Sequence, residues 1–146
     1  MTDRERLQRK LAEQKARNII KKIRSVQIIG QETCALPDHA LLEKLGFYSQ
    51  DKKPDSAIPE CADLQEIIDR MLSLLNDESG EIFFLLIYGV IYKVRFTDRA
   101  AALRELWTAP EAGRYICLLN EDKTVLYEFG SDSRDEDNYL FDKYQL

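Results

Sequence analysis

The chain contains few of the side chains that metal-ion or nucleophilic chemistry requires. Its single histidine is His39, and its three cysteines are Cys34, Cys61 and Cys117. Because a zinc site needs several convergent ligands, a cluster of Cys34, His39 and Cys61 would form only if folding brought these residues together. Cys34 and His39 are close in sequence, but the pair carries no signature of a nucleophile and its base. We therefore predict no metal site, no cofactor and no catalytic residue of these kinds.

Other chemical motifs are equally weak. The six glycines form neither a dinucleotide fingerprint nor a phosphate-binding loop. Paired carboxylates can act as acid and base, but among 26 acidic residues some pair is expected by chance, so a carboxylate-based enzyme is the least favoured alternative. The segment DSRDEDN at residues 132–138 lacks the alternating carboxylates, central glycine and terminal glutamate of a calcium loop. It indicates an acidic loop.

Charge is unevenly distributed along the chain. Residues 1–24 carry nine Lys or Arg against three acids, whereas the whole chain has a net charge of -5. This basic segment could contact phosphates or an anionic membrane. However, its apolar stripe has no aromatic anchor, and the acidic remainder of the chain would repel a polyanion. We therefore disfavour nucleic-acid and membrane partners, and expect the segment to pack on its own domain or on a second copy.

The C-terminal segment combines acidic and aromatic residues. Large aromatic side chains often anchor protein interfaces, and acidic neighbours accelerate encounter with a basic partner. The same aromatics would equally serve to dock the segment on its own sheet, and a loose tail is the third alternative. The candidate partner-binding residues are Asp132, Asp135, Glu136, Asp137, Tyr139, Phe141 and Tyr144, together with Phe47 and Tyr48 at the start of a long connection.

The first half of the chain predicts helices separated by irregular segments. Apolar residues at intervals of three or four predict an amphipathic helix over residues 3–24. A short strand is expected over residues 26–29, ended by Gly30. Asp38 and Gly46 suit the two ends of a short leucine-rich helix. Residues 46–62 contain two prolines and no periodicity, which predicts a long connection.

The second half predicts two hairpins and two helices. Residues 63–75 have a wide apolar face behind Asp63, which is a helix-capping residue. The run over residues 82–96 predicts two strands with a turn at Tyr88 and Gly89, a single bent strand being the alternative. Thr97 or Asp98 should cap a helix that continues to Trp107. A second hairpin follows, with RYICLL and TVLYEF joined by NEDK.

These elements predict an α+β fold with a mainly antiparallel four- to five-stranded sheet, helices on one face and a projecting N-terminal helix. We divide the chain into a basic amphipathic helix (residues 1–24), a globular α+β domain (25–130) and an acidic, aromatic C-terminal segment (131–146). The sequence shows neither a signal peptide nor a membrane-spanning run, so we expect a cytoplasmic protein.

We predict a small, acidic, non-enzymatic protein-binding domain. By analogy of size and charge, the most favoured role is an inhibitor or immunity protein that blocks a basic, nucleic-acid-acting partner. Its carboxylates would substitute for phosphates. The alternative is an adaptor subunit that forms homo-oligomers through the N-terminal helix.

Overall fold

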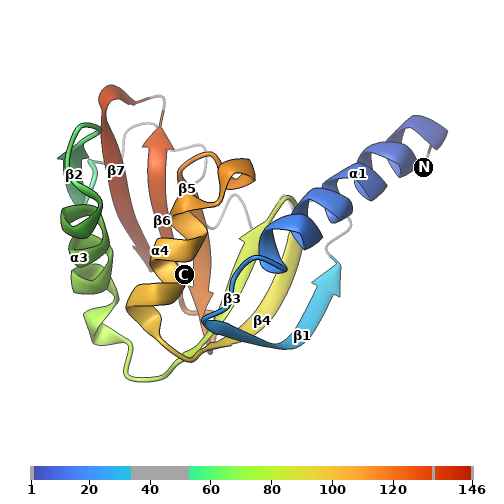
Figure 1. Cartoon of the computed structure of the whole chain (residues 1–146), viewed down its shortest axis with the longest axis horizontal. Helices are drawn as coiled ribbons and strands as arrows, with labels where there is room; N and C mark the ends of the chain where they lie inside the picture. The colour runs from blue at the N-terminus through green and yellow to red at the C-terminus, as the bar shows by residue number, and fades with distance from the viewer. Residues whose placement is uncertain (1, 34–52, 133, 146) are drawn as a thin grey trace.

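The computed structural model describes residues 2–33, 53–132 and 134–145 (Figure 1). The predicted short helix between Asp38 and Gly46 lies outside these residues. The elements follow in this order: α1 (Asp3–Ile20), β1 (Val26–Thr33), β2 (Ser56–Pro59), α3 (Leu64–Leu74), η1 (Leu75–Asp77), β3 (Ile82–Ile87), β4 (Val90–Phe96), α4 (Arg99–Thr108), η2 (Pro110–Ala112), β5 (Tyr115–Asn120), β6 (Val125–Asp132) and β7 (Asp135–Gln145).

The described strands form one antiparallel sheet in the order β1-β4-β3-β5-β6-β7-β2. The α+β prediction is therefore confirmed, but the sheet has seven strands, not four to five. The two additional strands are β2, within the segment predicted to be an irregular connection, and β7, within the acidic C-terminal segment. Strand β1 also continues past Gly30, where the register with β4 shifts, so the prediction that Gly30 ends this strand is wrong.

Local signals set the other boundaries. The backbone N–H groups of Glu66 and Ala101 donate hydrogen bonds to the capping side chains of Asp63 and Asp98, both at 3.0 Å. Tyr88 and Gly89 have φ angles of 48° and 79°, which identifies the tight β3–β4 turn and excludes the single bent strand. These features confirm both caps and the first hairpin.

All three described helices contribute to the larger of two apolar clusters. Ile20 of α1, Met71 of α3 and Trp107 of α4 are buried there against inward-facing residues of the sheet. Figure 1 shows α3 and α4 in front of the strands, while the first turns of α1 extend beyond the sheet. None of these helices has both the length and the apolar character needed to cross a bilayer.

The first turns of α1 leave apolar side chains in solvent. Thr2 and Glu5 form a capping box at the start of the helix. Leu7 and Leu11, one helical turn apart, are 59% and 54% exposed, whereas Ala16, Ile19 and Ile20 are buried. Only the last turns of α1 therefore contribute to the core. The helix ends at Ile20 rather than at residue 24.

Strand β7 contributes to the core through alternate residues. Phe141 is fully buried and makes an edge contact with Phe129, with ring centroids 5.5 Å apart. Tyr139 makes a similar contact with Trp107 at 4.9 Å. The C-terminal segment is thus docked on the sheet, one of the alternatives drawn from the sequence.

We expect Phe141→Ala to lower the free energy of unfolding by about 3–5 kcal/mol, because it removes a buried ring and leaves a cavity. Leu11→Ala, a truncation at an exposed position, should change it by less than about 0.5 kcal/mol. Urea denaturation measures both. Equal, small effects would show that β7 is not integral to the core.

Candidate functional site

Strands β5, β6 and β7 bring polar side chains together on the sheet face opposite the helices. The register pairs Cys117 with Glu128, and Glu128 with Asp142. Because alternate residues of a strand share a face, Tyr115 and Tyr144 lie on this face as well. The buried apolar residues beside them form the second, smaller cluster: Phe84, Ile91, Cys117, Leu119 and Leu126.

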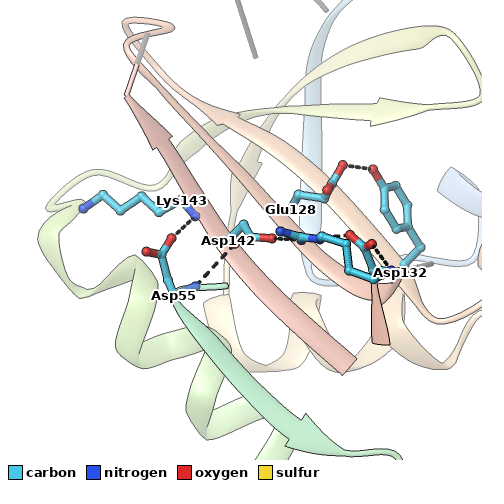
Figure 2. A network of polar contacts seen from close by, with 7 residues as sticks. Asp55, Glu128, Asp132, Asp142 and Lys143 are labelled. Carbon is cyan, nitrogen blue, oxygen red and sulfur yellow. Dashed lines mark hydrogen bonds and ion pairs between the residues drawn. The ribbon is translucent and has the colours of Figure 1, made fainter. Parts of the chain in front are cut away.

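Arg134 at the β6–β7 turn joins two carboxylates, those of Asp132 and Asp142, which are labelled in Figure 2. Its guanidinium donates to Oδ2 of Asp132 at 2.9 Å and also to Oδ2 of Asp142. Its backbone N–H donates to Oδ1 of Asp132 at 2.9 Å. The side chains of Arg134 and Asp142 are only 12% and 1% exposed. Hydrogen bonds from Arg134 hold the pKa of Asp132 below its ordinary value, and the bond to Asp132 raises the pKa of Arg134.

The bonds of Arg134 to Asp132 and Asp142 belong to an ion-pair network that also includes Asp55. This network holds the chain just before β2 in place. The backbone N–H of Asp55 donates to Oδ1 of Asp142 at 3.3 Å. In return, the backbone N–H of Lys143 donates to Oδ2 of Asp55 at 2.7 Å (Figure 2). The buried Asp142 therefore connects three segments: the start of β2, strand β7 and the β6–β7 turn.

Glu128 and Tyr115 lie on the same face of the sheet, on the β5 side of Asp142. The Tyr115 hydroxyl donates to Oε2 of Glu128 at 2.6 Å. Burial raises the pKa of Glu128 and of Tyr115, and it raises the pKa of the Cys117 thiol to about 12. Cys117 is therefore protonated at neutral pH and is a poor nucleophile. Glu128 therefore holds a proton more readily than an exposed glutamate does.

The three carboxylates are close enough to share a cation. Ligand oxygens of Glu128, Asp132 and Asp142 all lie within 4.8 Å of one another. Arg134, however, already bonds to two of these residues, so its guanidinium supplies positive charge at this position. A metal ion would have to displace it, and the arrangement fits a buried ion-pair network better than a metal centre.

An apolar cavity of about 210 Å³ lies beside Tyr115 and Cys117. It is bounded by the ends of β3 and β5, the last turns of α1, the helix α4 and the short helix η2. Its lining residues are Ile19, Leu85, Leu86, Ile87, Tyr88, Leu106, Ala112, Tyr115, Ile116 and Cys117. The space suits an apolar group about as large as one bulky side chain.

A group of acidic residues lies where β7 meets β2. The backbone N–H of Glu60, just after β2, donates to the carbonyl of Asp137 at 3.2 Å, and Ala62 turns back to Pro59 before helix α3 begins. The chain between β2 and α3 therefore lies beside the start of β7. We call the following six residues the acidic surface: Glu60, Asp63, Glu66, Asp135, Glu136 and Asp137.

The acidic surface is not neutralised from within. No Lys or Arg in the described ranges forms an ion pair with any of its six carboxylates. Asp135 accepts hydrogen bonds from the Asn138 amide at 2.8 Å and from the Asp137 backbone at 2.9 Å. The bond from Asn138, followed by that from Asp137, lowers the pKa of Asp135. This carboxylate is both ionised and held in place.

The residues predicted from the sequence are distributed over several environments. Asp135, Glu136 and Asp137 belong to the acidic surface. Asp132 instead forms an ion pair with Arg134 and is part of the ion-pair network. Tyr139 and Phe141 are core residues, and Tyr144 is half-buried on the opposite face. The predicted residues Phe47 and Tyr48, and the candidate ligands Cys34 and His39, lie outside the described residues.

The network residues Glu128, Arg134 and Asp142 are not among the residues predicted from the sequence. Each is a charged residue within a segment that looked like a solvated strand or loop. The only usable signal was alternation: Leu140, Asp142 and Tyr144 occur at every second position, as expected for one face of a strand. The high density of acids before them concealed this pattern.

We expect Arg134→Met to lower the free energy of unfolding by about 3–5 kcal/mol, because it leaves the Asp142 charge buried without its guanidinium partner. Lys143→Met is the control. It removes an ion pair to Asp77, whose side chain is 79% exposed, and should cost less than about 1 kcal/mol. Urea denaturation would contradict the network if both substitutions had the same effect.

Glu128 should make stability depend on pH in a defined direction. Burial raises its folded-state pKa above the ordinary value of 4.5, so its contribution to stability is present at low pH and lost as pH rises through the folded pKa. Glu128→Gln, which cannot ionise, should be more stable than wild type at neutral pH. The difference should vanish below about pH 4. Denaturation curves that differ equally at all pH values would show that Glu128 is not desolvated.

No protein-family model, curated protein or solved structure matches this chain. Its function is therefore inferred from its own residues. Three features are available for that purpose: the acidic surface, the apolar cavity and the buried network behind the β6–β7 turn.

Proposed function

We propose that this chain is a non-enzymatic protein-binding domain whose acidic surface binds a basic partner. The observation that carries the proposal is the set of six carboxylates without a described cationic partner at the junction of β7, β2 and α3, five of them on exposed residues. Like charges gathered in this way repel one another, and an approaching basic surface relieves that repulsion.

Hydrogen bonds hold the backbone beneath the acidic surface in place. The β6–β7 turn is anchored from behind by the bonds of Arg134 to Asp132 and Asp142. Asp63 and Glu66 are fixed at the first turn of α3, where negative charge also interacts favourably with the helix dipole. A charged surface whose backbone is already ordered loses little conformational entropy on binding.

The most favoured role remains that of an inhibitor or immunity protein that blocks a nucleic-acid-acting protein. Such a partner presents basic residues spaced to bind phosphates, and carboxylates on an ordered surface can occupy the same positions. Tyr139 and Phe141 are buried in the core, so an apolar anchor for this contact has to come from elsewhere on the surface. Encounter would depend on charge and therefore on salt.

A second candidate function is supported by the exposed leucines of α1. Leu7 and Leu11 lie one turn apart on a helix that extends beyond the sheet. Such a pair can pack against the same pair of a second copy. An adaptor subunit that assembles through α1 is therefore the alternative.

The test compares two variants that remove the same charge from opposite ends of the sheet. Glu136→Gln with Asp137→Asn alters the acidic surface, whereas Glu121→Gln with Asp122→Asn alters the β5–β6 turn. Proteins that bind this chain are captured from the native host at low salt. Each captured protein is then purified, and stopped-flow measurement gives its association rate constant with wild type and with both variants. For the partner, we expect the first variant to reduce the association rate constant about tenfold at low salt, with little change in dissociation.

The second variant should associate like wild type, and high salt should remove the difference. Equal association rates for the two variants would contradict the proposal. Recovery only of copies of this chain, abolished by Leu7→Ser with Leu11→Ser, would establish the adaptor role instead.

A further inference from the structure

The apolar cavity lies where two neighbouring strands of the sheet stop pairing. Strand β3 forms six residue pairs with β4 but only three with β5, ending at Leu85 and Leu118. Beyond this point, residues of both β3 and β5 line the cavity. Ile19 of α1 and Leu106 of α4 line it from the layer of helices. The opening between β3 and β5 is therefore bounded by helices on one side.

The walls of the cavity favour an apolar occupant. Seven of its ten lining residues have aliphatic side chains, so a water molecule would find few partners there. The Tyr115 hydroxyl is bonded to Glu128, and burial raises the pKa of Cys117 to about 12, so neither side chain adds a charge. An apolar cavity of about 150 Å³ can stay dry and bind benzene, and this one, at about 210 Å³, has room for a longer hydrocarbon chain.

The cavity reaches the surface at Tyr88. This residue lines the cavity and is 47% exposed, whereas the lining residues Leu106 and Ile116 are buried. We call the border of the cavity at Tyr88 its mouth. An elongated occupant therefore has one end among aliphatic side chains and the other end near solvent.

Two basic residues border the cavity. The Lys15 Nζ lies over the Tyr88 ring, 5.6 Å from its centroid. Arg114 is exposed and belongs to the two-residue link between η2 and β5, next to the lining residue Tyr115. The helix α1, which carries Lys15, packs against η2. No carboxylate in the described ranges forms an ion pair with either cation.

Helix α1 makes the charge around the cavity positive. Glu111 of η2 and Arg114 cancel in a count of charges, but residues 1–24 carry nine Lys or Arg against three acids. The acidic surface lies beyond β6 in the sheet, at β7, β2 and the start of α3. An anionic group is therefore favoured at the mouth of the cavity.

We propose that the cavity binds a small amphiphile made of an unbranched hydrocarbon chain and a carboxylate. The chain fills the apolar space between β3 and β5. The carboxylate stays at the mouth, where Lys15 and Arg114 attract it. This binding site is separate from the acidic surface and does not depend on the proposed function.

Ligands of equal chain length test the site on the wild-type protein. The probes are octanoate, octanol and octylammonium, and calorimetry gives each Kd. NMR records contacts between the ligand chain and the methyl groups of Ile19, Leu106 and Ile116. We expect octanoate to saturate a single site and to contact these methyl groups. Octylammonium should bind about tenfold more weakly, because the cations at the mouth repel it.

Two results with these ligands would overturn the inference. Equal Kd values for octanoate and octylammonium would exclude recognition of the carboxylate. Contacts confined to the exposed leucines Leu7 and Leu11 would show that the chain binds to the outside of α1 and not in the cavity.

A substitution in the cavity wall tests the place of the hydrocarbon chain. Ala112→Leu should reduce the space in the cavity and weaken octanoate binding about tenfold. Ala57→Leu, at an exposed position on β2, is the matched control and should leave Kd unchanged. An octanoate Kd that is the same in both variants would place the ligand outside the cavity.

Charge variants test the place of the carboxylate. Lys15→Gln with Arg114→Gln should weaken octanoate binding at least about threefold and leave octanol binding unchanged. Lys10→Gln with Lys123→Gln removes the same charge elsewhere. Lys10 is more than one turn from Lys15 on a different side of α1, and Lys123 follows the other end of β5. Equal effects of the two pairs would show that only the overall charge matters, and would overturn the assigned position of the carboxylate.

Discussion

The antiparallel pairing of β6 with β7 positions the core, the ion-pair network and the acidic surface. One face of β7 places Tyr139 and Phe141 in the core, and the other face places Asp142 in the ion-pair network. The free edge of β7 is the template for β2. The turn that begins β7 carries half of the acidic surface. Core, network, edge strand and acidic surface therefore form together.

Burial decides how the negative charge of this chain is used. Asp142 is removed from water, and a buried carboxylate is tolerated only when cations and hydrogen bonds compensate it. Arg134 and the backbone of Asp55 meet that requirement. Glu136 and Asp137 stay in water, where a carboxylate needs no partner. The same short stretch of sequence thus supplies both an ordered scaffold and free charge for recognition.

The opening between β3 and β5 shows a different balance. Strand pairing ends at Leu85 and Leu118, and the last turns of α1 and the short helix η2 border the region beyond. Ile19 and Ala112 line the cavity together with both strands. The resulting gap is lined mostly by apolar side chains of the two strands and the neighbouring helices.

Short-range chemistry determined those parts of the fold that the sequence predicted correctly. The positive φ angles of Tyr88 and Gly89 and the capping aspartates Asp63 and Asp98 act within a few residues, so a local pattern suffices to locate them. The candidate site was less accessible. Asp135, Glu136 and Asp137 were predicted from charge alone, but the grouping of Glu60 with Asp137 requires β2 to pair with β7.

Whether the last segment is a tail or a strand depends on pairing with distant parts of the chain. Strand pairing stabilises β7 through hydrogen bonds to β6 and β2, which lie elsewhere in the chain, and no local propensity encodes those partners. Local sequence patterns suffice for the apolar helix faces, the tight turn and the net charge. The tertiary structure determined which carboxylates are buried and which face solvent, because that depends on long-range register.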